Sequence, residues 1–306
     1  MKEKFNKIVA LEPLLITKEG KKTLNNFAKE IVFYETIATD EKDIIKRIGD
    51  ADCILLRFST KITAGILNNC PKIQYIGMGC SYYGDQFSNL DMHTARKNGI
   101  QVTYLKDYGD EGVTEGIIAQ LITLLHGFGK MKRSQRSCEL GGMKIGIIGL
   151  GTTGILTAHA LKHFGCDVYY YSRTRKIEQE NLGIKYLPLE KLLETVEVIS
   201  THLPRDTKIL HEKEFKKFGN GKIFINTSIG STYDINAMKK WLDNSNNFHI
   251  CDSPTKTLEN EIIRKHPQTI YIDQSFGETQ QCVQRSTRQT LRNIRIFLDS
   301  QHIRQE

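Results

Sequence analysis

The stretch KIGIIGLGTTGILTAHALKHFG, residues 144–165, constrains the fold of this chain more than any other feature. An uninterrupted apolar segment runs directly into Gly149, Gly151 and Gly154, and a helical pattern follows. In this context the spacing is typical of a turn that binds the pyrophosphate of a dinucleotide. The N–H groups at the helix start, including those of Thr152 and Thr153, are suited to bind phosphate oxygens. A glycine-rich turn without a ligand is the alternative interpretation.

The end of the second strand of this series favours one dinucleotide over the other. NAD-binding turns usually place a carboxylate there, which accepts hydrogen bonds from the ribose. Here the segment YYYSRTRK provides Ser172, Arg173, Thr174 and Arg175 instead. A hydroxyl followed by a guanidinium fork suits a 2′-phosphate, so the sequence predicts NADP(H) in preference to NAD(H). The alternative is that both arginines are solvated surface residues.

Apolar strand-like runs alternate with helical patterns along the whole chain. One series occupies the first hundred residues, and a second begins at residue 143. Such alternation predicts an α/β protein with doubly wound parallel sheets, and 306 residues suit two domains. Residues 111–131 form a long apolar pattern between the two series, which is either a bridging or dimer-forming helix or a core helix. Residues 278–301 form an amphipathic tail helix, with Cys282, Ile294, Ile296 and Phe297 among its apolar positions.

Composition excludes several classes of protein. The net charge of +8 comes from scattered Lys and Arg residues, so we expect no nucleic-acid partner. The seven cysteines include no C-x-x-C pair, which disfavours a metal site or a disulfide framework and favours a reducing compartment. The chain has no apolar run of membrane-spanning length, and its first twenty residues make a poor signal peptide. We expect a cytoplasmic protein with no membrane partner.

Several segments together resemble the D-2-hydroxyacid dehydrogenase family. Residues 89–122 resemble the family's stretch between its two domains, and residues 140–154 its nucleotide turn. YYSRTRK is similar to the NADP-preferring glyoxylate and hydroxypyruvate reductases. THLPRDTK stands at the adenosine-side loop, which includes His202, Leu203 and Pro204. FINTSIGSTYDINAM and HICDSP match two segments around the nicotinamide, where the resemblance places Thr227, Ser228 and Asp252.

The resemblance also implies an architecture. A flavodoxin-like substrate domain, residues 1–108 and 284–306, would receive an inserted Rossmann dinucleotide-binding domain, residues 109–283. The two domains of family members close over a cleft that holds a small-molecule substrate and the nicotinamide. Family members are commonly homodimers, so the resemblance implies a homodimer here.

Three positions depart from the family's catalytic pattern. Ile229 stands where the family has an arginine that grips the substrate carboxylate, and Gln274 stands where it has a histidine. Thr257 occupies the position of the glutamate that raises the pKa of that histidine. Glutamine can donate a hydrogen bond but cannot deliver a proton at neutral pH. The predicted site therefore keeps its cofactor side and loses the usual grip on a 2-oxo acid.

Other polar side chains are candidates for the substrate pocket. The segment GMGCSYYGDQFSNLD is longer than its family counterpart and contains Tyr82 and Tyr83. A tyrosine can donate a proton or stack on a ring, and the alternative is that both tyrosines merely pack the loop. Glu111 could reach a substrate, although negative charge at the start of the long helix is the interpretation that we prefer.

Three hypotheses on function follow. The first is an NADP(H)-dependent oxidoreductase that acts on a non-standard carbonyl, imine or activated alkene. The second is a catalytically silent NADP(H)-binding sensor or scaffold. The third is an ordinary 2-hydroxyacid dehydrogenase or glyoxylate reductase.

Overall fold

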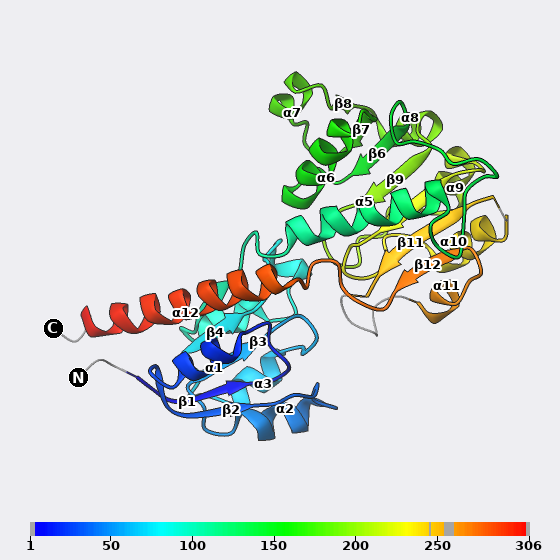
Figure 1. The fold of residues 1–306 in the computed structure, drawn as a ribbon. Coiled ribbons are helices and arrows are strands. Elements are labelled where there is room, and N and C mark those ends of the chain that lie inside the picture. The colour runs from blue at the N-terminus through cyan, green and yellow to red at the C-terminus, as the bar shows by residue number, and fades with distance from the viewer. Residues whose placement is uncertain (1–3, 245, 254–259, 304–306) are drawn as a thin grey trace. The chain divides into compact units, whose positions relative to one another are not determined.

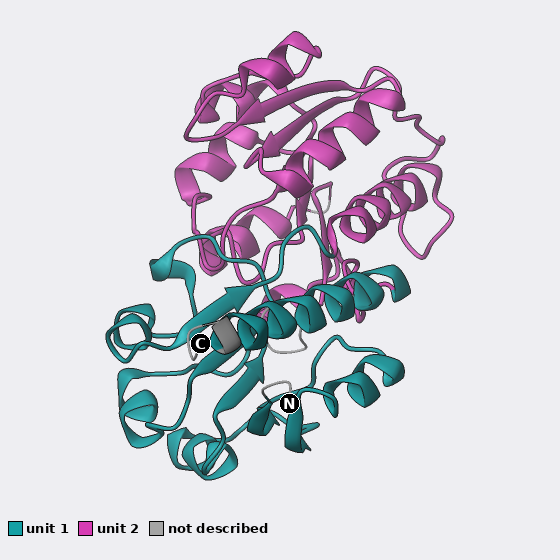
Figure 2. Cartoon of the chain, turned by 90° about the vertical axis from the view of Figure 1, so that its left-hand side faces the viewer, with its two compact units in different colours: residues 1–108, 280–306 teal, residues 109–279 magenta. Residues whose placement is uncertain are grey.

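The structure, a computed structural model, describes residues 4–244, 246–253 and 260–303. The chain forms two compact units, which Figure 2 distinguishes by colour. Unit 1 comprises Met1–Tyr108 and Gln280–Glu306, and unit 2 comprises Gly109–Thr279. The sequence places the second division after residue 283, whereas the contacts place it after Thr279, because the last helix begins at Gln280 and belongs as a whole to unit 1.

Unit 1 is built on a five-stranded parallel sheet with the order β2-β1-β3-β4-β5. This is the flavodoxin-like order, in which β2 is added on one side of β1 and the later strands are added on the other side. The strands are β1 (Phe5–Ala10), β2 (Ala28–Phe33), β3 (Cys53–Leu56), β4 (Tyr75–Met78) and β5 (Gln101–Tyr104). The helices are α1 (Lys18–Leu24), α2 (Glu41–Ile48), α3 (Ala64–Asn69), η1 (Asp85–Phe87), α4 (Met92–Lys97) and α12 (Gln280–Ile303).

Local sequence explains where the helices of unit 1 begin and how the last one packs. Four helices start at a side chain that accepts a hydrogen bond from the first turn, namely Thr17, Asp40, Thr63 and Asp91. Helix α12 closes the core, because the ring of Phe297 stacks on Phe5 at 5.5 Å and lies 4.9 Å from Tyr75. The amphipathic pattern places most apolar residues of α12 inward, but Ile296 is exposed.

Unit 2 contains a seven-stranded parallel sheet with the order β12-β11-β10-β9-β6-β7-β8. The strands are β6 (Lys144–Ile148), β7 (Asp167–Tyr171), β8 (Lys185–Tyr186), β9 (Val198–Thr201), β10 (Ile223–Asn226), β11 (Phe248–Asp252) and β12 (Thr269–Ile272). The helices are α5 (Asp110–His126), α6 (Thr152–His163), α7 (Ile177–Asn181), α8 (Leu189–Thr195), α9 (Glu212–Phe218), α10 (Ile235–Leu242) and α11 (Glu261–Arg264). Helices cover both faces of this sheet (Figure 1), and the prediction of two doubly wound parallel-sheet domains is confirmed.

Helix α5 is part of the core of unit 2. Its buried side chains, Ile117, Leu121, Leu124 and Leu125, join the cluster that includes the strands β6 and β7. It also packs against α6, where the hydroxyl oxygens of Thr114 and Thr157 lie 3.1 Å apart. These contacts support the interpretation of the long apolar pattern as a core helix.

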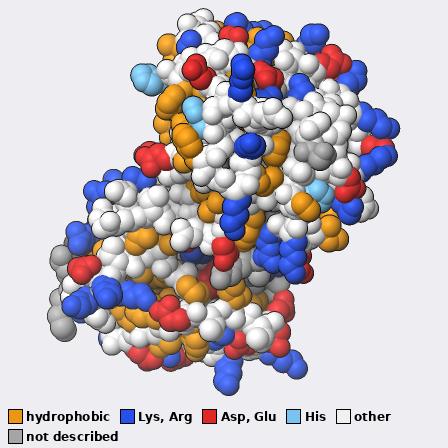
Figure 3. Space-filling model, turned by 45° about the vertical axis from the view of Figure 1, so that its right-hand side comes forward, with side chains coloured by type: hydrophobic (Ala, Val, Ile, Leu, Met, Phe, Trp, Pro, Cys, Tyr) orange, Lys and Arg blue, Asp and Glu red, His pale blue; other side chains and the backbone are white. Residues whose placement is uncertain are grey.

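Within the described ranges, no helix is long and apolar enough to cross a membrane. The same residues contain no group of three or more His, Cys, Asp or Glu side chains that could hold a metal ion. On the face in Figure 3, Lys and Arg side chains lie in small groups among acidic and uncharged ones.

The buried His249 makes stability depend on pH. Its Nδ1 lies 3.0 Å from the Phe224 carbonyl oxygen, and burial lowers its pKa from 6.5 to about 4. The unfolded chain therefore binds the extra proton at pH values where the folded chain does not, so the contribution of His249 to the free energy of unfolding rises with pH from about 4 to 6.5 and is constant above. This residue contributes at most about 3 kcal/mol to the change.

We expect His249→Gln to flatten the profile of unfolding free energy against pH, measured by urea unfolding at pH values that span this window. The pKa of His202 is also lowered to about 4, so the difference between wild type and variant isolates His249. An unchanged slope in the variant would contradict the prediction.

Candidate functional site

The turn between β6 and α6 contains three glycines whose surroundings differ (Figure 1). Gly149 has a φ of 96°, and a Cβ there would collide with the carbonyl of His202. A Cβ on Gly154 would collide with the carbonyl of Gly149. A Cβ on Gly151 would have no described heavy atom within 4 Å and would project into open space. Close packing thus explains two glycines, and the third leaves room where a pyrophosphate would lie.

The start of α6 is suited to bind an anion. Its N-cap residue, Gly151, makes no side-chain capping bond, and the first turn contains no acidic residue. Its N–H groups therefore point outward with the positive end of the helix dipole. Thr152 is exposed, but the hydroxyl of Thr153 donates a hydrogen bond to Oδ1 of Asp110. Thr153 thus offers a ligand its backbone N–H, while its hydroxyl proton is engaged.

The segment after β7 contains the residues predicted to select the cofactor. Ser172 donates a hydrogen bond to the carbonyl of Thr174 at 2.5 Å, which tightens the turn. Arg175 is paired with Glu180 of α7. Arg173 is exposed and makes no hydrogen bond or ion pair with any residue that the structure describes. The two arginines that the sequence treats alike therefore differ in their availability.

Ser228 joins the loop after β9 to the loop after β10. Its hydroxyl donates to the Thr201 carbonyl at 3.1 Å and accepts from the Leu203 N–H at 3.0 Å. His202, between these two residues, has its Nε2 3.0 Å from the Ser200 hydroxyl. Burial lowers the pKa of His202 to about 4, so its imidazole is neutral at physiological pH. The predicted cofactor residues His202, Leu203, Pro204 and Ser228 therefore lie together.

The loop that contains Ile229 is held by buried polar groups. Asn226, at the end of β10, accepts hydrogen bonds from the Thr201 hydroxyl at 2.9 Å and from the Ser228 N–H at 3.3 Å. Its amide also donates to the Gly230 carbonyl at 3.2 Å. The half-buried Ile229, which follows Thr227 and Ser228, is fixed by this scaffold.

Asp206 is a second anchor of this loop, which the sequence analysis missed. Its N–H donates to the Ile229 carbonyl at 3.2 Å, and its carboxylate occupies the space that a Cβ on Gly230 would need. Asp206 has a φ of 53°, a conformation that aspartate tolerates better than most residues. Asp206 and Gly230 have no characteristic spacing in the sequence, so nothing in the sequence pattern pointed to this contact.

Asp252 and helix α5 fix the loop after β12, which contains Gln274. Oδ2 of the buried Asp252 accepts a hydrogen bond from the Phe276 N–H at 2.7 Å. A Cβ on Gly112 or Gly116 of α5 would collide with Phe276. Gln274 itself follows β12 by two residues and is exposed. The resemblance assigns Asp252 to the nicotinamide, and the structure adds a bond that positions the neighbouring loop.

Two other predicted pocket residues can be placed only in part. Thr257 lies outside the described residues. Glu111 lies exposed in the first turn of α5, together with Asp110. This position suits the interpretation that its charge stabilises the helix start.

The tyrosines of the longer loop belong to unit 1. The Tyr82 hydroxyl donates to Oδ1 of Asp85 at 2.5 Å, and Arg96 pairs with the same carboxylate at 2.6 and 2.9 Å. The hydrogen bond to Asp85 raises the pKa of Tyr82, whose ring also packs 4.8 Å from that of Tyr104. The Tyr82 hydroxyl is therefore bonded within its own loop, and its side chain is 42% exposed. Tyr83 is 60% exposed.

Unit 1 also contains two charged residues at the carboxyl ends of its strands, where ligands bind in open α/β sheets. Glu12 is buried and accepts hydrogen bonds from the N–H groups of Arg57 at 2.7 Å and Thr60 at 3.3 Å. Arg57 directly follows β3. The signal in the sequence was a charged residue at the end of an apolar strand, in VALEP and CILLR.

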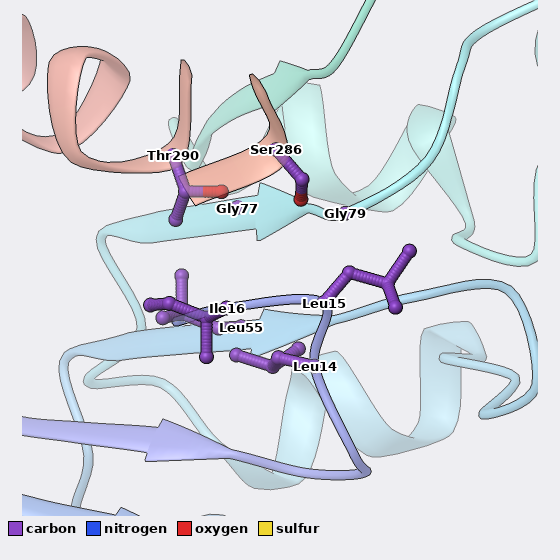
Figure 4. Close-up of a pocket in the computed structure, with 8 residues that line it drawn as sticks. All are labelled: Leu14, Leu15, Ile16, Leu55, Gly77, Gly79, Ser286 and Thr290. Carbon is purple, nitrogen blue, oxygen red and sulfur yellow. The ribbon is translucent and has the colours of Figure 1, made fainter. Parts of the chain in front are cut away.

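A small, mainly apolar pocket lies between the sheet of unit 1 and α12 (Figure 4). It is lined by Leu14, Leu15, Ile16, Leu55, Gly77, Gly79, Ser286 and Thr290.

The different environments of Gly151 and Gly154 give a test of the dinucleotide turn. We expect Gly151→Val to raise the Kd for NADPH by about tenfold or more, because the side chain would occupy the space of the pyrophosphate. Its thermal midpoint should stay close to that of the wild type, since nothing in the described structure contacts the new Cβ. The matched control, Gly154→Ala, should instead lose about 1–3 kcal/mol of stability. Wild-type affinity in Gly151→Val, measured by fluorescence titration, would contradict this site.

The protein-family model described as "D-isomer specific 2-hydroxyacid dehydrogenase, NAD binding domain" matches residues 120–270. Glyoxylate reductase from Thermococcus litoralis is 29% identical over 248 residues, which cover 74% of each chain. Glyoxylate reductase from Pyrococcus horikoshii is 31% identical over 229 residues, or 66% of this chain and 67% of that protein. These matches span the nucleotide turn and the strands that surround it.

The fold also matches solved structures over nearly the whole chain. One is an acyclic imino acid reductase in complex with NADPH and D-Arg, with a TM-score of 0.79 and 21% identity, covering 96% of this chain and 97% of that one. This likeness shows the fold alone, whereas the family model and the curated relatives show descent. The chain belongs to the D-isomer specific 2-hydroxyacid dehydrogenase family of oxidoreductases, which confirms the resemblance seen in the sequence.

Proposed function

We propose that this protein is an NADP(H)-dependent reductase that acts on a carbonyl, an imine or an activated alkene other than an ordinary 2-oxo acid. The observation that carries the proposal is the pair of Ile229 and Gln274 in the loops after β10 and β12. Hydrogen bonds to the buried side chains of Asn226 and Asp252 hold both loops, so each loop has a defined conformation. Hydrocarbon and amide stand where the resemblance has arginine and histidine.

The cofactor side of unit 2 supports the proposal. The turn at Gly149, Gly151 and Gly154 and the uncapped start of α6 fit a dinucleotide. The exposed Arg173 and the lack of a carboxylate at the end of β7 favour a 2′-phosphate. When bound, NADPH supplies a hydride to the acceptor.

The remaining residues limit what the site can do. Ile229 cannot hold a carboxylate, and the amide of Gln274 can only orient an acceptor by a hydrogen bond. The Tyr82 hydroxyl donates its hydrogen bond to Asp85. We propose that the proton comes from a tyrosine, from water or from the substrate itself. Thr257 stays a proposed departure from the family pattern.

The relatives indicate which acceptors to test. Curated relatives are named glyoxylate reductase and hydroxypyruvate reductase, which favours the ordinary activity as a second candidate. The structural neighbour named as an acyclic imino acid reductase makes imines the first non-standard class. A silent NADP(H)-binding protein is the third candidate.

Assembly as a homodimer is part of the proposal, and it is supported by the exposed Phe128 after α5 and Phe164 after α6.

The choice of cofactor is tested by Arg173→Ala. We expect the wild type to bind NADPH more tightly than NADH, and the variant to lose about tenfold in NADPH affinity, which corresponds to one charge-assisted contact. NADH affinity should not change, because NADH has no 2′-phosphate. Arg136→Ala removes another exposed arginine, in the segment after α5, and serves as the control. Equal dissociation constants for the two cofactors in the wild type, by fluorescence titration, would refute the preference.

The choice of substrate is tested by the triple variant Ile229→Arg, Thr257→Glu and Gln274→His. We expect it to gain about two to three decades in kcat/KM for glyoxylate, because it regains a bidentate carboxylate contact and a proton donor. Ile229→Leu, which keeps an apolar side chain, should not gain this activity. Turnover is followed by NADPH consumption with glyoxylate, hydroxypyruvate and a panel of carbonyls and imines.

Each alternative has its own outcome in that assay. Ready reduction of glyoxylate by the wild type would support the ordinary reductase. Tight NADPH binding without oxidation by any acceptor in the panel would support the silent binding protein.

A further inference from the structure

The buried Tyr170 organises the segment between β7 and α7. Its hydroxyl donates a hydrogen bond to Oε1 of Glu180 at 2.8 Å and accepts one from the Lys176 N–H at 2.6 Å. Its ring packs edge-on against Tyr186 of β8 at 5.4 Å. Because Tyr170 is fully buried, it fixes both the end of this segment and the carboxylate of Glu180.

Glu180 in turn holds Arg175 by a two-point contact. Nε of Arg175 donates to Oε1 at 3.0 Å, and Nη2 donates to Oε2. The guanidinium also lies over the Tyr186 ring, with its carbon 5.2 Å from the centroid. The Glu180 side chain is only 17% exposed, whereas that of Arg175 is 57% exposed, so the pair lies at the surface with its carboxylate turned inward. Such side-on pairing uses the same donor fork that would bind a phosphate.

Arg173 lies two residues earlier in the same segment and has no partner among the described residues. The charge offered to a ligand is therefore uneven. Arg175 and Glu180 neutralise each other, whereas Arg173 keeps its full positive charge.

We propose that Glu180 is a specificity-determining residue that withholds Arg175 from the 2′-phosphate, so that Arg173 alone binds it and the preference for NADPH is restrained. Tyr170 is the positioning residue that holds Glu180 in place. This inference rests on the proposed NADP(H) preference of the same site. It predicts that NADH stays usable and that removing one carboxylate sharpens selectivity.

The first measurement is the ratio of the dissociation constants for NADH and NADPH in Glu180→Gln, by fluorescence titration of the full chain. We expect NADPH to bind about tenfold more tightly than in the wild type, as one released charge-assisted contact would give, with NADH unchanged. Glu212→Gln is the matched control, because Glu212 is an exposed carboxylate of unit 2 that pairs with Lys216 and Lys240. The control should leave the ratio unchanged.

The second measurement is a double-mutant cycle between residues 175 and 180. Adding Arg175→Ala to Glu180→Gln should return NADPH affinity to within about twofold of the wild type, because the double variant replaces a neutral ion pair with two neutral side chains. In the Glu180→Gln background, the same change should cost about tenfold, because the released guanidinium has become a phosphate ligand. Tyr170→Phe, which keeps the ring but removes the donor to Glu180, should raise the ratio by a smaller factor.

Two results would overturn the inference. One is an unchanged ratio in both Glu180→Gln and Tyr170→Phe, when the thermal midpoints show that both variants are folded. The other is a loss of NADPH affinity in the double variant Arg175→Ala/Glu180→Gln that equals the loss in Arg173→Ala, which would mean that Arg175 binds the phosphate while paired. Failure of the proposed function has a different pattern. If the proposed NADP(H) preference is wrong, the wild type binds NADPH and NADH equally. A preference for NADPH that emerges in Glu180→Gln would still support the role of Glu180.

Discussion

The close approach of three backbone segments around Gly149 is the constraint on which the rest of unit 2 depends. Gly149 leaves no space for a side chain against His202, and Gly154 leaves none against Gly149. The strand β6, the helix α6 and the end of β9 therefore meet at van der Waals distance. This contact places the positive end of α6 and the loop after β9 at the carboxyl edge of the sheet, where ligands bind in such folds.

Buried polar side chains extend that framework to the loops on the other side of the sheet. Asn226 and Ser228 link the ends of β9 and β10, and Asp252 links β11 to the loop after β12. Each of these groups is costly to bury without a partner, so together they specify one loop arrangement. Ile229 and Gln274 therefore lie in loops whose conformations these hydrogen bonds specify.

Much of the fold follows from the sequence pattern. The alternating apolar and helical runs predict both parallel sheets, and the glycine spacing predicts the phosphate turn, because both depend on local geometry and burial. The side-chain roles are less accessible. Arg173 and Arg175 look equivalent in the sequence, but only Arg175 has Glu180 beside it. The hydrogen bond from Tyr82 to Asp85 and the pairing of Asp85 with Arg96 are likewise visible only in the structure. These differences arise from residues three or more positions away.

The sequence by itself determined the class of fold and the dinucleotide turn, since each is a property of residue type and spacing. The departures at Ile229 and Gln274 stay a prediction from the family resemblance. Only the tertiary structure decided which groups remain available to a ligand. Hydrogen bonds and ion pairs between elements engage Thr153 with Asp110, Arg175 with Glu180 and Asp252 with Phe276. A donor that is already paired must exchange one partner for another to bind a ligand, and that exchange depends on distances that residue order does not encode.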